Sequence, residues 1–196
     1  MRLGVVLTPD GWDGRARAAE QAGLDCVLVR ETALAAALAA VTSDLRVLVE
    51  IPVGSHPVGL AEELAVCDLL LQGRLTAVLA EDDPETCEVL EQALAGRRFR
   101  HDGPRWTFPR EGTIVVTPAP AQVALPVWPA GAVTVRPARL ETPGDVDRIV
   151  AELRGLDTGL CVLELESEDA IRLAGTRVRP QLQGIDLPPD LVASWD

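Results

Sequence analysis

Residues 3–29 read LGVVLTPDGWDGRARAAEQAGLDCVLV, and this segment indicates the fold class. Residues 3–7 are largely apolar and end at a Thr-Pro-Asp-Gly turn, which predicts a buried strand followed by a loop. Ala and Arg then recur at helical spacing over residues 13–22, up to Gly23, a typical helix end. The apolar run over residues 26–29 predicts a second strand. The segment therefore has the pattern of one β-α-β step.

The same alternation continues along the chain. Further strands are predicted over residues 45–53, 75–79, 127–128, 133–135 and 160–165. Helices are predicted over residues 32–41, 57–71, 142–154 and 167–182, with another opening at residues 83–85. Apolar strands separated by helices are typical of a parallel sheet covered by helices. The sequence therefore predicts an α/β fold with six or seven strands.

Residues 96–125 interrupt this alternation. Residues 97–101 and 106–108 are predicted as two short extended pieces joined by a turn at Asp102-Gly103-Pro104. The sequence Pro118-Ala119-Pro120 enforces a stretch that is not helical. Long loops on such a scaffold usually serve function or partner contact.

The length of 196 residues suits one domain but is short for a complete eight-fold barrel, which needs about 250 residues. We expect a single domain over residues 1–184 and a C-terminal tail over residues 185–196. No apolar run reaches the roughly 20 residues that a membrane span needs, and the N-terminus lacks the pattern of a signal peptide. A cytoplasmic protein without membrane contact is therefore predicted.

Charge and composition exclude several classes of function. The net charge is -12 and the sequence contains no Lys, so a nucleic-acid partner is disfavoured, and Schiff-base catalysis and a P-loop lysine are excluded. The absence of Tyr excludes phenolic acid/base chemistry. The four cysteines form no C-x-x-C pair, which favours buried structural thiols over a redox or metal site.

A series of short motifs resembles one known family. Residues 17–25 (RAAEQAGLD) and Glu31 are similar to the first β-α-β segment of luciferase-like monooxygenases, and residues 38–43 (LAAVTS) to their second helix. A stretch from His56-Pro57 through Asp68 to Gly73-Arg74 is similar to the next part of that family. Later matches are Phe99, Gly103, Trp106, residues 118–122 and Thr142-Pro143.

The resemblance implies a TIM-barrel-like (β/α) fold that is incomplete, because one β-α region is missing between Gly131 and Val133. It also implies a flavin-dependent monooxygenase or oxidoreductase, using FMN or deazaflavin F420, that acts on a small organic substrate. A dimer through the second and third helices is implied as well. An incomplete barrel leaves strand edges that a second copy or a different subunit would cover.

Two positions depart from the family pattern. Thr32 follows Glu31 where family members often place His. Residues 80–83 read Ala-Glu-Asp-Asp where the family favours a glycine-rich turn that lets backbone approach the flavin. Three adjacent acids also repel a flavin phosphate. Binding of no cofactor is therefore as strong an expectation as binding of FMN or F420.

Glu31, Glu50 and His56 are the candidate catalytic residues. They end or follow predicted strands, and active sites of (β/α) barrels collect at the carboxyl ends of the strands. His56 is a candidate for proton transfer, with the alternative that His56-Pro57 only begins a helix. The acids at 81–83 also follow a strand, with the alternative that they stabilise a helix N-terminus. Clustered carboxylates can bind a metal or shift one another's pKa values, although no metal site is predicted. His101 is expected to be solvated.

Arg136, Arg139 and Trp128 are the candidate cofactor-binding residues. The two arginines follow the penultimate strand, where barrels often bind phosphate, and guanidinium groups suit phosphate oxygens. Trp128 would stack on a planar ring. The alternatives are ordinary surface arginines and a tryptophan needed for packing.

Three functions stay open at this point. The first is a flavin-linked oxidoreductase of reduced size, and the second is a non-catalytic binding module or partner subunit that keeps the scaffold. The third is a cofactor-free enzyme that uses Glu31, Glu50 or His56 as acid and base.

Overall fold

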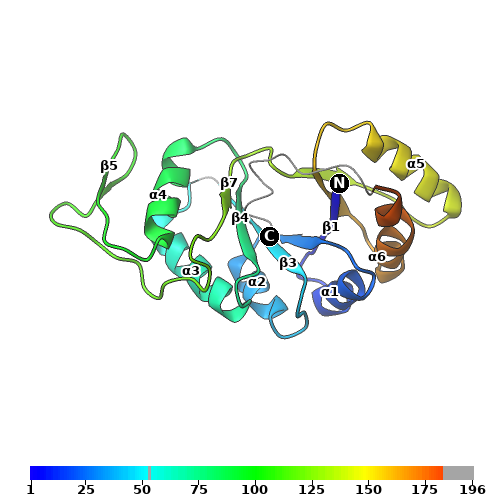
Figure 1. The fold of residues 1–196 in the computed structure, drawn as a ribbon, viewed down its shortest axis with the longest axis horizontal. Helices are drawn as coiled ribbons and strands as arrows, with labels where there is room; N and C mark the ends of the chain where they lie inside the picture. Colours follow the sequence, from blue (N-terminus) through cyan, green and yellow to red (C-terminus); the bar gives the residue numbers. More distant parts are fainter. Residues whose placement is uncertain (53, 183–196) are drawn as a thin grey trace. The chain divides into compact units, whose positions relative to one another are not determined.

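A computed structural model describes residues 1–52 and 54–182 of the chain (Figure 1). Within these residues, seven strands form one sheet in the order β7-β4-β3-β2-β1-β9-β8. The strands are β1 (Arg2–Val6), β2 (Cys26–Val29), β3 (Arg46–Ile51), β4 (Leu75–Leu79), β7 (Val127–Trp128), β8 (Thr134–Pro137) and β9 (Leu160–Glu164). The α-helices are α1 (Trp12–Gln21), α2 (Thr32–Leu38), α3 (Pro57–Leu70), α4 (Pro84–Leu94), α5 (Pro143–Arg154) and α6 (Glu168–Leu173).

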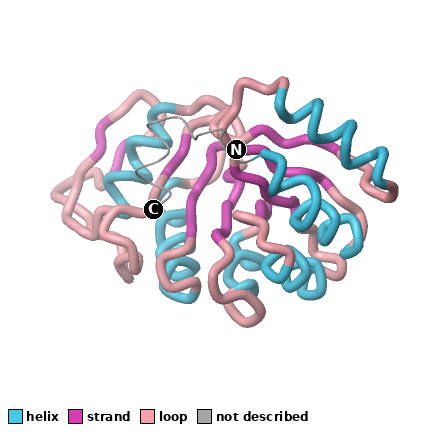
Figure 2. The backbone as a smooth tube through the Cα atoms, turned by 45° about the vertical axis from the view of Figure 1, so that its right-hand side comes forward, coloured by secondary structure: helices cyan, strands magenta, loops and turns pink. Residues whose placement is uncertain are grey.

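The sheet has the parallel pairing that the sequence predicts. The pairs β1–β2, β1–β9, β8–β9 and β4–β7 are all parallel, and Val5 lies opposite Val27 on one side and Leu163 on the other. A parallel pair needs a crossover connection, which explains why helices alternate with strands along most of the chain (Figure 2). Strands β1, β2, β4 and β9 are almost entirely buried, as expected for a sheet that is covered on both faces.

The barrel is incomplete. Strands β7 and β8 follow one another in the sequence but stand at opposite ends of the strand order. Residues 129–133 connect them and contain no helix. This is the position at which the resemblance implies a missing β-α region, and the predicted fold class is confirmed.

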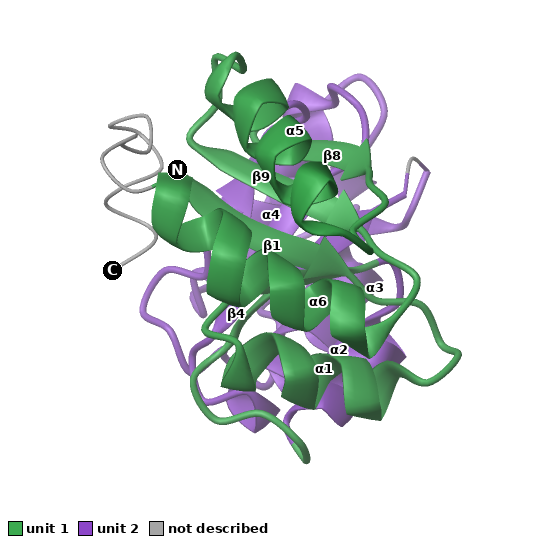
Figure 3. Ribbon diagram, turned by 90° about the vertical axis from the view of Figure 1, so that its right-hand side faces the viewer, with its two compact units in different colours: residues 1–29, 40–47, 132–196 green, residues 30–39, 48–131 purple. Residues whose placement is uncertain are grey.

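The chain divides into two compact units (Figure 3). The first comprises residues 1–29, 40–47 and 132–196, and its described part holds β1, β2, β8 and β9 with α1, α5 and α6. Helix α1 packs on α6. The carboxylate of Asp25 is 5% exposed and accepts two hydrogen bonds from Arg179, at 2.9 and 2.8 Å, and one from the backbone of Leu3. This contact fastens the end of the described chain to β1.

The second unit comprises residues 30–39 and 48–131. It holds α2, α3, α4, β4, β7, most of β3 and a separate two-stranded hairpin of β5 (His101–Asp102) and β6 (Thr107–Phe108). Helix α3 packs against α2 and α4. The hairpin confirms the two extended pieces predicted around Asp102-Gly103-Pro104, since His101 pairs with Phe108 and Asp102 with Thr107.

The last predicted helix is not uniform. Helix α6 ends at Leu173 and continues as a π-helix (Ala174–Val178) and a 3-10 helix (Arg179–Leu182). Gly175 lies in the π-helix so close to the backbone of Ala22 that a side-chain carbon there would collide with the Ala22 carbonyl oxygen. The tail predicted over residues 185–196 lies outside the described residues, and the single domain over residues 1–184 stays a prediction. In the described part of the chain, no helix has the length and apolarity to cross a membrane.

Candidate functional site

The carboxyl ends of β2 and β3 and the first turns of α3 enclose a cavity of about 240 Å³ in the second unit. Its apolar wall is formed by Ala33, Val49, Ile51, Pro52 and Leu60. Its polar lining consists of Arg30, Glu31, Thr32, Glu50, Ser55 and Glu63. Ligands of parallel α/β folds bind at the carboxyl ends of strands, so this cavity is the candidate site.

The structure brings Glu31 and Glu50, two of the three predicted catalytic residues, into this cavity. Glu50 accepts a hydrogen bond of 2.7 Å from Nε of Arg30. Glu63, which the sequence did not single out, accepts one of 2.8 Å from the hydroxyl of Thr32. Glu31 is the N-cap residue of α2, yet its side chain caps no backbone N–H and has no partner within the described residues. Glu31 is therefore the carboxylate that is available to a ligand.

His56, the third predicted catalytic residue, begins α3 next to Ser55 but does not line the cavity. Its Nδ1 accepts a hydrogen bond of 3.5 Å from the backbone N–H of Gly59. His56 thus caps the start of α3, which is the alternative role that the sequence offered for it. The exposed ring lies 5.4 Å from the ring of Trp106 and 5.8 Å from that of Phe108. His56 therefore contacts the β5–β6 hairpin from a position next to Ser55 of the cavity lining.

The hairpin is fixed to the first turn of α4 by Glu85. This carboxylate accepts hydrogen bonds from the backbone N–H of Trp106 at 2.9 Å and of Arg105 at 3.1 Å, and contacts Nε2 of His101 at 3.0 Å. Burial alone would raise the pKa of Glu85, but these contacts, led by that from Trp106, outweigh burial and lower the pKa. His101 is 7% exposed, so the expectation of a solvated histidine is wrong. The hairpin fold and Glu85 shield it from water.

Asp83, one of the acids after β4, has a local structural role. Asp83 is the N-cap of α4 and accepts hydrogen bonds from the backbone and the hydroxyl of Thr86 and from Arg105. Burial favours a higher pKa for Asp83, but these hydrogen bonds, first those from Thr86, lower the pKa. The helix-start interpretation of this acid is therefore supported by its contacts.

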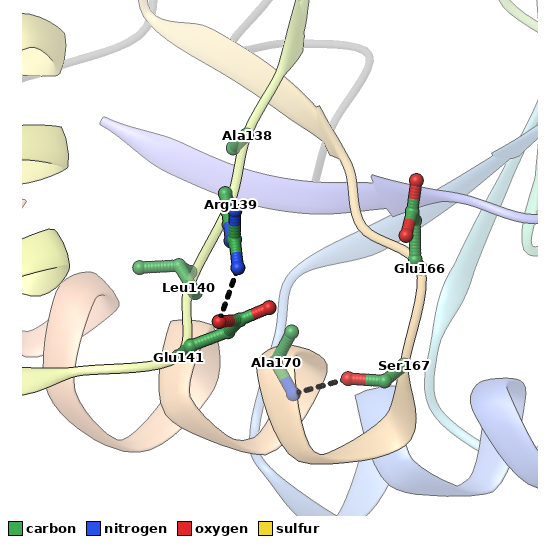
Figure 4. Close-up of a pocket in the computed structure, with 7 residues that line it drawn as sticks. All are labelled: Ala138, Arg139, Leu140, Glu141, Glu166, Ser167 and Ala170. Atoms are coloured by element: carbon green, nitrogen blue, oxygen red, sulfur yellow. Dashed lines mark hydrogen bonds and ion pairs between the residues drawn. The ribbon is translucent and has the colours of Figure 1, made fainter.

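Arg139 lines a different cavity, of about 390 Å³, at the carboxyl ends of β8 and β9 in the first unit (Figure 4). Figure 4 shows its guanidinium directed at Glu141, 2.8 Å away, and Glu166 borders the same cavity. The hydrogen bond from Arg139 to Glu141 raises the pKa of Arg139 above its usual value. Arg136 lies exposed on β8 and does not line this cavity.

In each of the two cavities the arginine is paired with a carboxylate. Arg139 is already paired with a carboxylate, and Glu141 and Glu166 add negative charge beside it. The cavity of Glu31 and Glu50 has one guanidinium, also paired, among three carboxylates. Trp128 belongs to the second unit and is 3% exposed, so its ring is packed in the core in this structure. Its stacking role and the phosphate role of Arg136 and Arg139 stay predictions.

A metal centre is not formed in the part of the chain that the structure describes. No group of three or more His, Cys, Asp or Glu side chains there is arranged to hold a metal ion.

Comparison with known proteins agrees with this fold. Residues 11–84 match the family described as luciferase-like monooxygenase. The resemblance to luciferase-like monooxygenases is confirmed. The matched stretch contains Glu31, Glu50 and His56, so the whole candidate site except the hairpin lies in its luciferase-like part. Comparison with curated proteins finds no match.

Three solved structures are similar in fold. Monooxygenase RslO1 from Streptomyces bottropensis is 18% identical, with a TM-score of 0.54 over 96% of this chain and 68% of that chain. The coenzyme F420 dependent tetrahydromethanopterin reductase from Methanopyrus kandleri is 14% identical, with a TM-score of 0.65 over 93% of this chain and 99% of that chain. The oxygenating constituent of 3,6-diketocamphane monooxygenase from Pseudomonas putida, a complex with FMN, is 17% identical, with a TM-score of 0.52 over 96% of this chain and 64% of that chain. The present chain thus spans less than two thirds of the camphane enzyme, and the three likenesses establish the fold alone.

Proposed function

We propose that this chain is a luciferase-like oxidoreductase or monooxygenase of reduced size, which binds a small organic substrate in the Glu31–Glu50 cavity. The observation that carries the proposal is the meeting of these two carboxylates at the carboxyl ends of β2 and β3, inside the luciferase-like stretch. A ligand there contacts an apolar wall on one side and charged groups on the other. We also propose a cytoplasmic protein that associates as a homodimer or with a different subunit.

The cavity restricts the substrate. Its volume of about 240 Å³ is below the usual size of drug-like ligand sites, about 300–1,000 Å³, so a small molecule is expected. Three carboxylates face one guanidinium, which disfavours an anionic substrate and favours one that donates hydrogen bonds. Glu31 is the group that accepts such a bond, because Glu50 and Glu63 already have partners.

FMN or deazaflavin F420 is the cofactor that the proposal includes, since two of the similar proteins are described with F420 or FMN. Such a group supplies the redox chemistry when bound. Because the arginines of both cavities are paired with carboxylates, we assign no reaction step to it.

A second candidate is a non-catalytic binding module or partner subunit. It is favoured by one specific observation: Arg139, one of the two arginines predicted to hold phosphate, is paired with Glu141. Such a chain keeps the scaffold and the small-molecule cavity while binding no flavin of its own.

Titration of the purified chain with FMN and with F420, followed by visible absorption, tests the proposal. Binding with a spectral shift at micromolar ligand supports the oxidoreductase. The absence of any shift at millimolar ligand refutes the flavin-dependent function and leaves the second candidate.

The substrate cavity is tested separately by binding of a small set of organic amines and alcohols, measured by calorimetry. Glu31→Gln should weaken binding about tenfold, since one charge-assisted hydrogen bond is lost. Glu88→Gln on α4, whose carboxylate accepts a hydrogen bond from Gln92 outside the cavity, is the matched control. Equal affinity of the two variants would refute a role of Glu31 in the site.

A further inference from the structure

The β5–β6 hairpin has few bonds of its own. Its strands have two residues each, and a turn bond of 2.9 Å from Gly103 N–H to the Trp106 carbonyl closes its tip. An isolated two-stranded hairpin is marginally stable in water. The position of residues 100–111 therefore depends on contacts with the rest of the second unit.

These contacts converge on the first turn of α4. Glu85 receives the two backbone N–H groups of Arg105 and Trp106 and the ring of His101. A second connection runs through Arg105, whose guanidinium donates to Asp83 at 2.7 Å. The indole N–H of Trp106 donates to the hydroxyl of Thr86 at 3.1 Å. One helix turn therefore holds the entire tip of the hairpin.

The base of the hairpin is built for a hinge. Phe99 and Ile114 exchange two backbone hydrogen bonds of 2.9 Å, which hold together the two chain segments that lead into and out of the hairpin. Two glycines have positive φ: Gly96, at 66°, precedes Phe99, and Gly112, at 77°, lies between residue 111 and Ile114. Such glycines absorb changes of backbone direction at little steric cost, which is typical of hinges.

The hairpin contacts residues 54–56, the segment before α3 that includes Ser55 of the cavity lining. Trp106 and Phe108 rest on His56, the residue next to Ser55 of the cavity lining. A side-chain carbon on Gly54 would lie 3.9 Å from the guanidinium of Arg105, so the hairpin approaches this segment at Gly54 as well as at His56. Opening of the hairpin would remove these contacts from residues 54–56, which include Ser55 of the cavity lining.

We propose that residues 100–111 form a hinged lid over the start of α3, and that the carboxylate of Glu85 is the latch that keeps this lid closed. The lid acts on the cavity of the proposed function, but its opening is a property of the chain without ligand. A lid held by a few hydrogen bonds, most of them to one carboxylate, allows a partner or substrate to shift the lid between open and closed states with modest energy.

Hydrogen exchange of the unliganded chain, measured by mass spectrometry, tests the latch. In Glu85→Gln, the peptide covering residues 100–108 should exchange about tenfold faster, because an amide cannot accept all three donors as a carboxylate does. Peptides from α4 and β4 should keep the wild-type rate. Glu88→Gln, a change of the same type on the outer face of α4, should leave all peptides unchanged.

Arg105→Gln is a second variant that leaves Glu85 and the helix turn intact. It removes the contact with Asp83 and should speed exchange in the same peptide only, so it decides the question if Glu85→Gln does not fold. Equal exchange of residues 100–108 in both variants and in wild type would overturn the proposal. A rise that spreads equally into α4 and β4 would also overturn it, because the lid would then not open by itself.

Discussion

Asp68 provides the sharpest test of how the second unit is held together. Its side chain is fully buried on α3 and accepts hydrogen bonds from the backbone and side-chain N–H groups of Gln122, at 2.9 and 2.8 Å. A third, longer bond of 3.4 Å comes from the backbone of Leu75. These contacts attach the irregular segment before β7 to the helix and to β4, so replacement of Asp68 by Ala should loosen that segment.

The magnitude follows from the two short bonds. A hydrogen bond to a charged acceptor contributes about 1.5–3 kcal/mol, so the pair contributes about 3–6 kcal/mol. Removal of the buried charge offsets part of this loss, and we expect Asp68→Ala to lower the free energy of unfolding by about 3–5 kcal/mol. Asp68→Asn keeps one acceptor oxygen and should lose about 1–3 kcal/mol.

Urea unfolding at pH 7, followed by far-UV circular dichroism, measures these differences. Glu62→Ala, an exposed change on the same helix, is the control and should stay within about 0.5 kcal/mol of wild type. A double-mutant cycle with Gln122→Ala should give a coupling of about 1–3 kcal/mol. A loss below about 1 kcal/mol in Asp68→Ala, or strict additivity with Gln122→Ala, would refute the role assigned to these bonds.

Three further predictions concern the rest of the chain. Thr142→Ala breaks the capping box with Asp145 and should destabilise the chain by about 1 kcal/mol in urea unfolding. Hydrogen bonds from Thr142 lower the pKa of Asp145 to about 2. The capping box therefore stabilises the folded chain fully above the usual carboxyl pKa, and this stabilisation is lost as the pH falls through about 2. A penalty that does not shrink near pH 2 would contradict this. Gly4→Ala should cost about 1–3 kcal/mol, because the added carbon collides with Cys26, and a variant as stable as wild type would show that β1 and β2 can separate there. Burial raises the pKa of three thiols to about 11, so the native chain should react with a disulfide reagent at pH 8 about a hundredfold more slowly than the unfolded chain. These thiols are Cys67, Cys87 and Cys161, and fast labelling of the native chain would contradict the expectation.

The sequence predicted the regular elements well because their signals are local. The run over residues 26–29 and the run over residues 75–79 are strands with the predicted bounds. The helix start at Thr142-Pro143 is also confirmed, since an N-cap hydroxyl, a proline and an acid in the first turn act within a few residues of one another.

Predictions about burial and partners were weaker for side chains in irregular segments. His101 is buried although its neighbours in the sequence are polar, because Glu85, from a different element, folds over it. Glu63 lines the candidate cavity without any local sign of it, and no local pattern indicated the ion pair of Arg139 with Glu141. Arg30 could have been noticed, since it directly precedes Glu31 at the end of a strand.

Periodicity and turn residues in the sequence predicted the alternation of strands and helices and the parallel sheet, because these signals act over short distances. The loss of one β-α region was predicted from the resemblance to luciferase-like monooxygenases. Other features became evident only in the folded chain. Glu31 and Glu50 line one cavity, in which Arg30 donates a hydrogen bond to Glu50 and Thr32 donates one to Glu63. Glu85 holds the hairpin through its contact with Trp106. These pairings join residues far apart in the chain, and their geometry is fixed by the packing of helices on the sheet.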